Sequence, residues 1–365
     1  MTSSYRCWVE IDCAALRSNA KIVRERIGSA DLLAVVKANA YGHGMIGSAQ
    51  ALANDVQLFG VANLEEASAL RESLTHPIII LGPALPAEMP AIVEEGFIPT
   101  ISTFAEGEDF NGLAGARAVA INFKVDTGMG RMGVPENEAL ALFQKIASLP
   151  KITIHSVSTH LPVSNEDADY TRDEIERFRA LVREFREQVS GDYKAHILQS
   201  AGLLAFPKEP NEIVRAGIIL FGISPLPEHQ QILEPAMTWK TRLGLIRNLP
   251  KGTSISYGRT FIAPRAMRVA TLTAGYADGY PRHLSNREAA VLVRGQRCPL
   301  LGRVTMDLMV IDLSKIDDAQ PGDEVVLMGR QGDKKIPCAE LAEKASTITW
   351  EITTRIGARV RRVFI

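Results

Sequence analysis

The sequence predicts an α/β protein in which a (β/α)8 barrel of the TIM type is followed by a mainly β domain. Eight short apolar runs alternate with helical patterns between residues 32 and 218, and this alternation is typical of parallel strands joined by helices. Beyond Met237 the helical patterns become rare, while short β-like runs continue. The length of 365 residues is consistent with about two domains.

The elements follow in chain order. The first strand-like segment is "CWVEI", and Asp12 can cap a helix that continues to a stop near Gly28. Helical patterns are expected at residues 64–73, 87–96, 135–148 and 171–190. The eight strands are expected at Leu32–Lys37, Gln57–Ala62, Pro77–Leu81, Phe97–Ser102, Val119–Val125, Ile152–Thr159, Ala195–Gln199 and Ile213–Ile218.

A doubly wound sheet would also fit this alternation, but two features favour the barrel. The strand count reaches eight, and polar residues stand at or near the carboxyl ends of the strands. These ends converge on one mouth of a barrel, where distant residues can meet. The polar residues are Lys37, Asp126, His160, Ser200 and Arg215.

The second domain is predicted from the short runs "RVATLTAG", "AAVLVRG", "LMVIDL", "EVVLMG" and "ARVRRVFI". The Pro-rich segment near Pro225–Pro235 marks the junction. We therefore expect the barrel over residues 11–233 and the β domain over residues 234–365, joined by a strand from residues 1–10.

Composition excludes several classes of function. The chain is 46% hydrophobic and 23% charged, with a formal net charge of −1, so it lacks the basic face that nucleic-acid binding requires. Its apolar runs are shorter than the ~20 residues of a membrane span. The four cysteines form neither a CxxC pair nor a metal-ligand spacing, which predicts free thiols and no metal. Residues 1–10 do not resemble a signal peptide, so a cytoplasmic location is expected.

The stretch "LLAVVKANAYGHG" delivers Lys37 from an apolar run into a Gly-rich turn. A lysine at the end of a strand usually reaches solvent, but one at a barrel mouth is partly desolvated. Desolvation lowers the pKa of the amine and makes it a nucleophile for a carbonyl cofactor. Ser200 and Gly217–Ile218 follow the seventh and eighth strands, where barrel enzymes commonly hold phosphate. Together they suggest a phosphorylated aldehyde.

Six motifs in order, "AVVKANAYGHG", "VDTGMGRMG", "STH", "VRAGIILFG", "SYGRTF" and "GYADGYPR", resemble the alanine racemase family along nearly the whole chain. The resemblance implies pyridoxal 5′-phosphate as the cofactor and a homodimer with active sites shared between subunits. It also implies a role in supplying D-alanine for cell-wall peptidoglycan.

The resemblance implies a role for each matching residue. Lys37 matches the lysine that binds the cofactor and serves as the base on the D face, and Tyr257 matches the opposite base, supplied by the partner subunit. Arg131 and Met306 match substrate-binding positions. The remaining matches are Tyr41, Ser200, Gly217 and Ile218 at the phosphate, Arg215 facing the pyridine nitrogen, His160 behind the ring, Tyr276 and Arg282 at the entryway, and Lys124 where some members carry a carbamylated lysine.

The sequence departs from the residues usual in the family at two positions. Ala358 stands where many members carry a tyrosine that walls the substrate pocket, and Thr305 stands where some have cysteine. A smaller wall would admit larger substrates, so a serine or broader-specificity racemase is the alternative. A decarboxylase on the same barrel usually places a carboxylate where this chain has Arg215. Single-domain cofactor-binding relatives lack the β domain, and a non-enzymatic interaction protein is the remaining class.

Overall fold

The computed structural model describes residues 5–209 and 212–365, and the chain forms two compact units. The barrel unit contains Leu16–Ala40 and Met45–Glu234, and the β unit contains Met1–Ala15, Tyr41–Gly44 and Pro235–Ile365. Of the strand segment expected at residues 1–10, residues 1–4 lie outside the described part. The units divide between Glu234 and Pro235, and the exact domain limits given above stay a prediction.

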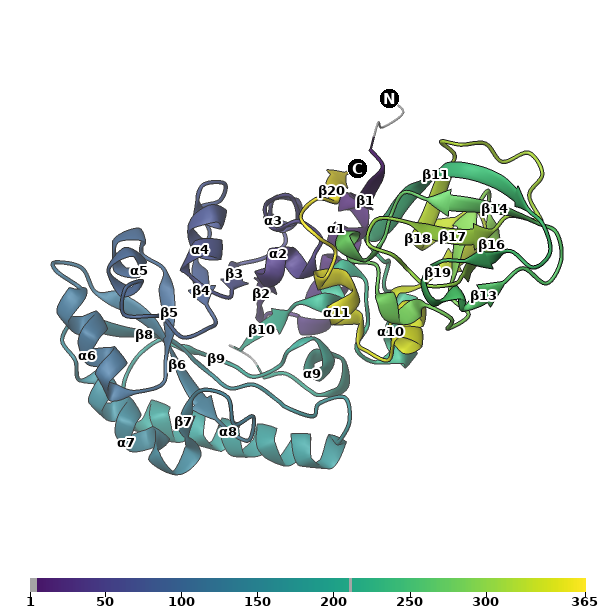
Figure 1. Ribbon diagram of the computed structural model, residues 1–365. Helices are drawn as coiled ribbons and strands as arrows, with labels where there is room; N and C mark the ends of the chain where they lie inside the picture. The colour runs from purple at the N-terminus through teal and green to yellow at the C-terminus, as the bar shows by residue number, and fades with distance from the viewer. Residues whose placement is uncertain (1–4, 210–211) are drawn as a thin grey trace. The chain divides into compact units, whose positions relative to one another are not determined.

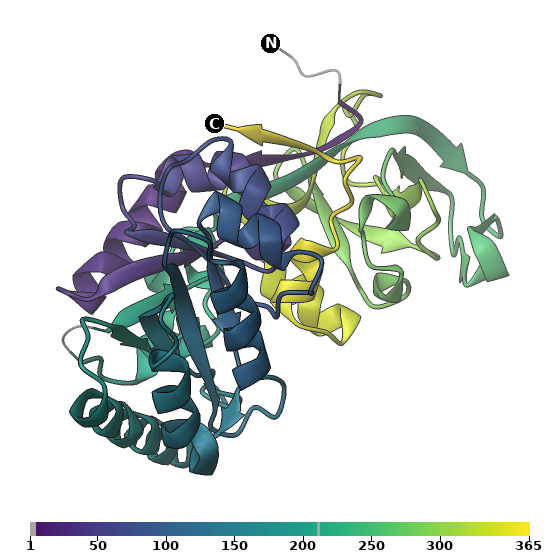
Figure 2. The same ribbon diagram turned by 90° about the vertical axis from the view of Figure 1, so that its left-hand side faces the viewer.

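The barrel unit is built on eight parallel strands in the described part of the chain (Figures 1 and 2). Their order is β10-β2-β3-β4-β5-β6-β8-β9, and a parallel bridge between Ala195 and Glu212 links the two ends. This confirms the predicted barrel. The strands are β2 (Asp31–Val35), β3 (Leu58–Val61), β4 (Ile78–Ile80), β5 (Ile98–Ile101), β6 (Val119–Asp126), β8 (Ile152–Ser158), β9 (Lys194–His196) and β10 (Ile213–Ala216); the short β7 (Val134–Pro135) pairs with β6.

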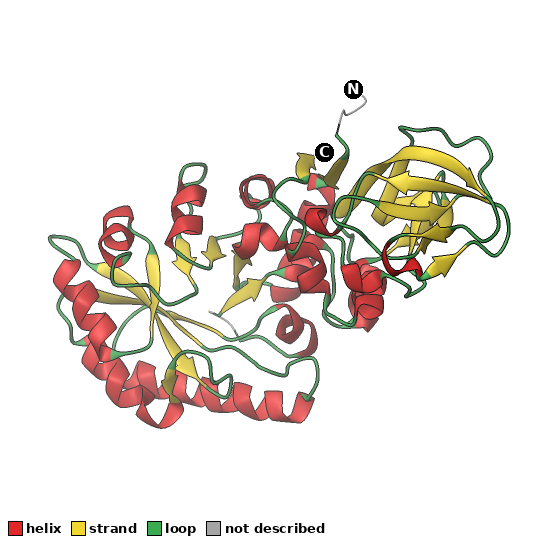
Figure 3. Ribbon diagram, in the orientation of Figure 1, coloured by secondary structure: helices red, strands yellow, loops and turns green. Residues whose placement is uncertain are grey.

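Helices cover the outside of these strands, as Figures 1 and 3 show for α5 to α8. Strands β3, β4, β5 and β10 are buried along their whole length, because helices and barrel interior exclude water from both faces. Phe123 of β6 packs against Phe143 and Phe185 from two of the helices. The helices are α1 (Cys13–Ile27), α3 (Met45–Leu52), α4 (Leu64–Arg71), α5 (Met89–Glu95), α6 (Phe104–Leu113), α7 (Glu136–Ala147), α8 (Ala168–Gln188) and α9 (Ser200–Ala205).

Side-chain caps explain where several helices begin. Asp12 Oδ1 accepts hydrogen bonds from the backbone N–H groups of Ala14 and Ala15, as predicted for α1. Asn63 caps α4, and Thr103 forms a capping box with Glu106 at α6.

In the β unit, six antiparallel strands close into a ring in the order β11-β14-β17-β16-β15-β18, because β18 also pairs with β11. Strand β1 (Cys7–Ile11) pairs with β11 on one side and β20 on the other. The further strands are β11 (Met237–Leu249), β14 (Met267–Leu272), β15 (Ala290–Val293), β16 (Gln296–Leu301), β17 (Met309–Asp312), β18 (Glu324–Gln331), β19 (Lys334–Ile336) and β20 (Arg361–Phe364), with a separate ribbon of β12 (Ser254–Ile255) and β13 (Phe261–Ile262).

Two short helices, α10 (Cys338–Ala345) and α11 (Thr349–Thr354), complete the β unit. No helix in the described residues is both long and apolar enough to cross a membrane. Within residues 5–209 and 212–365, His, Cys, Asp and Glu side chains form no group that could hold a metal ion.

Candidate active site

Lys37 begins an unusual turn directly after β2. The element labelled α2 (Lys37–Tyr41) has the left-handed conformation, with φ values of 52°, 55°, 54° and 52° at Ala38, Asn39, Ala40 and Tyr41. Each non-glycine residue in this conformation costs roughly 1–2 kcal/mol. Such strain persists only where surrounding contacts stabilise it, and it concentrates at functional sites.

Glu66 supplies part of that stabilisation. Its two carboxylate oxygens accept hydrogen bonds from the backbone N–H of Ala38 (2.7 Å) and of Ala62, just after β3 (2.8 Å). Asn39 Oδ1 accepts from the backbone N–H of Met45 at 2.8 Å. The turn after Lys37 is thereby tied to the neighbouring strand and to α3.

Four basic side chains lie around His160 in the barrel unit. Burial, followed by repulsion from Arg215, Lys124, Arg131 and Lys37, lowers the pKa of His160 to about 2. Lys124 lies in β6 and Arg215 in β10, while Lys37 follows β2 and Arg131 follows β6. The structure therefore brings together five of the residues that the sequence singled out. His160 is neutral at physiological pH.

Lys37 and Lys124, the two lysines of this cluster, both have lowered pKa values. Burial, followed by repulsion from Arg131, lowers the pKa of Lys37, while Glu66 opposes the shift. Burial and then Arg215 lower the pKa of Lys124 well below its ordinary value. A neutral amine is the nucleophilic form, so the environment of Lys37 favours attack on a carbonyl group.

Arg215 is 6% exposed, and its guanidinium is fixed by backbone carbonyls. Its NH1 donates to His196 O at 2.6 Å, and its NH2 donates to Thr159 O at 2.7 Å and Ile197 O at 3.0 Å. The loops after β8 and β9 thus hold one cation in the barrel interior. Its planar fork suits this multiple contact better than a lysine would.

The phosphate positions lie close together at the ends of β9 and β10. The backbone N–H of Gly217 donates to Ser200 Oγ at 3.0 Å, and Gly217 precedes the 3-10 helix η1 (Ile218–Phe221). Ser200 is the first residue of α9 and is 7% exposed. A buried hydroxyl and backbone N–H groups at two helix starts, beside an excess of positive charge, fit the dianionic phosphate of pyridoxal 5′-phosphate. Tyr41 ends the left-handed turn and is half-buried.

Tyr257 lies in the β unit and is 71% exposed. It starts the 3-10 turn η3 (Tyr257–Arg259) between β12 and β13. The preceding Ser256 has φ 63°, and its Oγ donates to Arg303 O at 2.6 Å. Gly258 has φ 73°, and a Cβ there would lie 2.8 Å from the Arg303 guanidinium. This anchored turn presents the tyrosine to solvent.

Met306 and Tyr276 lie on neighbouring loops of the β unit. The backbone N–H of Tyr276 donates to Thr305 O at 3.0 Å, and that of Ala277 donates to Met306 O at 2.9 Å. Gly275 is required at this contact, because a Cβ would lie 2.3 Å from Thr305 O. Met306 is 54% exposed and Tyr276 41%.

Arg282 is also exposed in the β unit, in η5 (Arg282–Leu284). Nearby in sequence, Asp278 is buried and accepts two hydrogen bonds from Arg359, at 2.7 and 2.9 Å. The same guanidinium donates to Asp307 at 2.8 Å, which connects the loops of Tyr276 and Met306. Ala358 precedes this arginine and is exposed.

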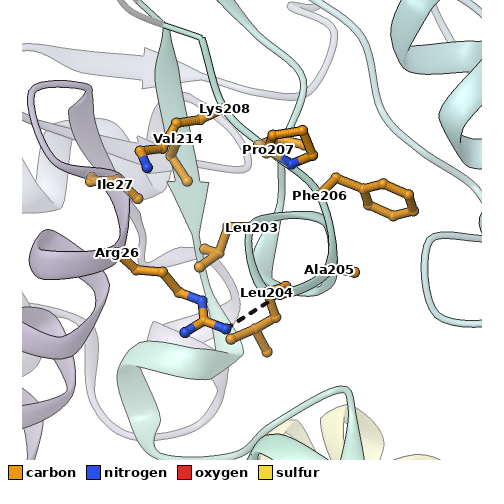
Figure 4. A pocket seen from close by; sticks show the side chains of 10 residues that line it. Arg26, Ile27, Leu203, Leu204, Ala205, Phe206, Pro207, Lys208 and Val214 are labelled. Carbon is orange, nitrogen blue, oxygen red and sulfur yellow. Dashed lines mark hydrogen bonds between the residues drawn. The ribbon is translucent and has the colours of Figure 1, made fainter.

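A separate pocket of about 200 Å³ lies beside α9 and contains none of the residues above (Figure 4). Mainly apolar side chains line it, together with Arg26 and Lys208, and Arg26 donates to Leu204 O at 3.4 Å. Its lining contains no histidine, cysteine or carboxylate side chain. The catalytic candidates therefore remain at the His160 cluster.

Sequence analysis did not single out three residues that support the site, namely Glu66, His196 and Asn122. Glu66 occupies the N3 position after the Asn63 cap, where glutamate is ordinary, so only its hydrogen bonds to Ala38 and Ala62 reveal the second role. Asn122 lies between Ile121 and Phe123 in β6, and His196 ends β9 just before Ile197 and Leu198, so a polar residue beside buried apolar neighbours is the available signal.

Two family models cover almost the whole chain. "Alanine racemase, N-terminal domain" matches residues 11–225, and "Alanine racemase, C-terminal domain" matches residues 236–364. Among curated relatives, the alanine racemase of Halothermothrix orenii is 40% identical over 98% of this chain and 96% of its own. That of Symbiobacterium thermophilum is also 40% identical, with the same coverage.

Solved structures agree with these matches. Alanine racemase from the D-cycloserine producer Streptomyces lavendulae superposes with a TM-score of 0.93 at 31% identity, covering 100% of this chain and 98% of its own. The Bacillus anthracis enzyme, solved with bound L-Ala-P, gives a TM-score of 0.91 at 32% identity, covering 100% and 96%. The likeness therefore extends across both units.

Proposed function

Because the chain belongs to the alanine racemase family, we propose that it interconverts L- and D-alanine with pyridoxal 5′-phosphate held at the mouth of its barrel. The observation that supports this most strongly is the convergence of Lys37, Lys124, Arg131 and Arg215 on a neutral His160. Serine is not favoured as the principal substrate, because the curated relatives reported above are named alanine racemases.

Most of the groups that would hold the cofactor belong to the barrel unit, whereas Tyr41 is counted with the β unit. Ser200 Oγ and the backbone at Gly217 and Ile218 would bind the phosphate, with the Tyr41 hydroxyl completing its contacts. Arg215 would face the pyridine nitrogen, and His160 would pack behind the ring. When bound, the cofactor delocalises the negative charge left by removal of the α-proton.

Two groups would move protons on opposite faces of the substrate. Because burial and then Arg131 lower the pKa of Lys37, its Nζ gives up its proton more readily than an ordinary lysine and can then take the α-proton of D-alanine. The Tyr257 hydroxyl would act on the L face, and Arg131 and Met306 would hold the substrate. Two opposed groups avoid the need for a single base to cross the planar carbanion.

We propose a homodimer in which Tyr257 and Met306 complete the site of the partner. Both are large apolar side chains that the single chain exposes, at 71% and 54%. Leu308 (41%) and Ile262 (53%) are exposed in the same unit, and burial of such surface favours association. Mixing Lys37→Ala with Tyr257→Phe subunits should restore activity, since each heterodimer has one unaltered site. No recovery after subunit exchange would exclude shared sites.

The remaining assignments follow from the same family. Tyr276 and Arg282 would line the entryway. Because burial and Arg215 lower the pKa of Lys124 well below its ordinary value, its amine can lose a proton and attack CO2, forming an N–C bond and losing a second proton, and the resulting carbamate would be stabilised by Arg131 and Arg215. Carbon-13 NMR under labelled bicarbonate tests this. We place the enzyme in the cytoplasm, where it would supply D-alanine for peptidoglycan.

The proposed activity is tested by a racemisation assay with added pyridoxal 5′-phosphate, followed by borohydride reduction and peptide mapping. We expect racemisation of alanine and a reduced cofactor label at Lys37. Lys37→Ala should abolish both, while Lys145→Ala, at an exposed position of α7, should change neither. Labelling at another lysine, or faster racemisation of serine than of alanine, would contradict the proposal.

A further inference from the structure

A chain of buried polar side chains crosses the interior of the barrel and ends at Arg215. Thr100 Oγ1 donates to the backbone carbonyl of Ile80 at 2.6 Å, and Asn122 Nδ2 donates to Thr100 Oγ1 at 2.9 Å. His196 Nε2 lies 2.9 Å from Asn122 Oδ1, and Arg215 NH1 lies 2.8 Å from His196 Nδ1. We name Thr100, Asn122 and His196 the core relay.

The directions of these hydrogen bonds are fixed step by step. The Thr100 hydroxyl gives its proton to a carbonyl and must accept from Asn122, so the amide nitrogen of Asn122 faces Thr100. The amide oxygen then faces His196, which must donate from Nε2. A neutral imidazole with a proton on Nε2 has a lone pair on Nδ1.

Arg215 requires that lone pair. A guanidinium has donors and no acceptor, so only an unprotonated Nδ1 can form the 2.8 Å contact with NH1. Burial and then the charge of Arg215 hold the pKa of His196 well below its ordinary value, so the ring stays neutral. A flipped Asn122 amide would turn its donor toward Nε2 and leave the Nε2 proton only Ser156 Oγ, 3.2 Å away, as an acceptor, which favours transfer of the proton to Nδ1, where it would repel the guanidinium.

The relay is nearly inaccessible to water. Thr100 is 2% exposed, Asn122 1% and His196 0%. Ser156, also 0% exposed, donates to Asn122 Oδ1 at 3.1 Å and supports the same amide orientation. Polar groups in a barrel core are costly unless each is satisfied, and here each has its partner.

We propose that Thr100 and Asn122 are positioning residues, which fix the tautomer of His196 and so hold Arg215 in the orientation that the active site uses. They touch neither substrate nor cofactor and act through His196. The effect on activity rests on the proposed racemase function. The assignment of the His196 tautomer does not depend on that function.

The first experiment measures the tautomer of His196 in the holoenzyme by nitrogen-15 NMR. The sequence has 7 histidines, so a His196→Gln variant suffices to assign the signals. We expect a proton on Nε2, none on Nδ1, and no titration over about pH 5–8. A proton on Nδ1, or an imidazolium in this range, would overturn the relay whatever the enzyme's activity.

The second experiment compares Thr100→Val with Thr171→Val. Both threonines are buried, and each hydroxyl donates to a backbone carbonyl, at 2.6 and 2.7 Å, but Thr171 lies on α8 outside the relay. In Thr100→Val the amide of Asn122 loses its acceptor, so His196 should show both tautomers. Only molecules that keep the proton on Nε2 keep the contact with Arg215, so kcat should fall in proportion to that fraction, about tenfold if roughly one-tenth of His196 keeps it.

The control should lose comparable stability while keeping one tautomer and the wild-type kcat. If Thr100→Val also kept a single tautomer and kcat within about twofold of wild type, the relay would be structural only. If wild type racemised no amino acid, the proposed function would fail while the tautomer measurement would still decide the relay.

Discussion

Gly42 follows the left-handed turn and is the position where the structure predicts the sharpest effect of a single methyl group. Its φ is 85°, and a Cβ would lie 2.0 Å from Thr353 O and 2.7 Å from Thr353 C. Ordinary contact begins at 3.4 Å, so Gly42→Ala forces two backbone segments of the β unit apart by more than an ångström. Tyr41, immediately before it, must move with the chain.

Gly96→Ala is the matched control. Gly96 also has a positive φ, 70°, but a Cβ there meets nothing within 4 Å. The control therefore loses only the free energy needed to hold a non-glycine residue at positive φ, roughly 1–2 kcal/mol. Gly42→Ala loses the same term plus roughly 1–3 kcal/mol for overpacking.

Thermal unfolding measures the difference. Because 1 kcal/mol shifts Tm by about 2–4 °C, Gly42→Ala should melt about 2–12 °C below Gly96→Ala. We also expect Gly42→Ala to bind pyridoxal 5′-phosphate more weakly, since Tyr41 is displaced, whereas Gly96→Ala should bind it normally. Equal Tm values for the two variants would refute the contact with Thr353.

Three further predictions concern charge. Glu66→Gln leaves one of two backbone amides without its acceptor and should lower the free energy of unfolding by about 1–3 kcal/mol, measured by urea denaturation, while Glu65→Gln should not. The pKa of His160 is lowered to about 2, so below about pH 6.5 only the unfolded state takes up this proton and the free energy of unfolding falls as the pH falls. His160→Gln should reduce that fall by about 1.4 kcal/mol per pH unit between about pH 6 and 4. The exposed His283→Gln is the control. Burial raises the pKa of Glu174 above 4.5, so Glu174→Gln should unfold at higher urea concentration at pH 7, and the gain should vanish as the pH falls below 4.5.

The barrel could be predicted because its signal is repeated along the chain. Eight apolar runs alternate regularly with helical patterns along the chain. A strand that is buried on both faces is a continuous apolar run, so it can be predicted without knowing which strand it pairs with. The Asp12 cap could be predicted for a similar reason, since its hydrogen bonds reach only two and three residues ahead.

The left-handed turn at Ala38–Tyr41 could not be predicted in the same way. None of these residues is a glycine, and the turn is stabilised in part by Glu66, which is distant in sequence. The core relay depends on registers between strands, because Thr100 meets Asn122 only when β5 and β6 pair as they do. Local sequence patterns contain no information on either contact.

The central claim is that Lys37 and Tyr257 act on opposite faces of the substrate. The most direct test is exchange of the α-proton in D2O, measured separately for each enantiomer with wild type and Tyr257→Phe. We predict that Tyr257→Phe still exchanges the α-proton of D-alanine through Lys37 but loses exchange from L-alanine, together with racemisation. Equal exchange from both enantiomers in this variant would contradict the two-base account.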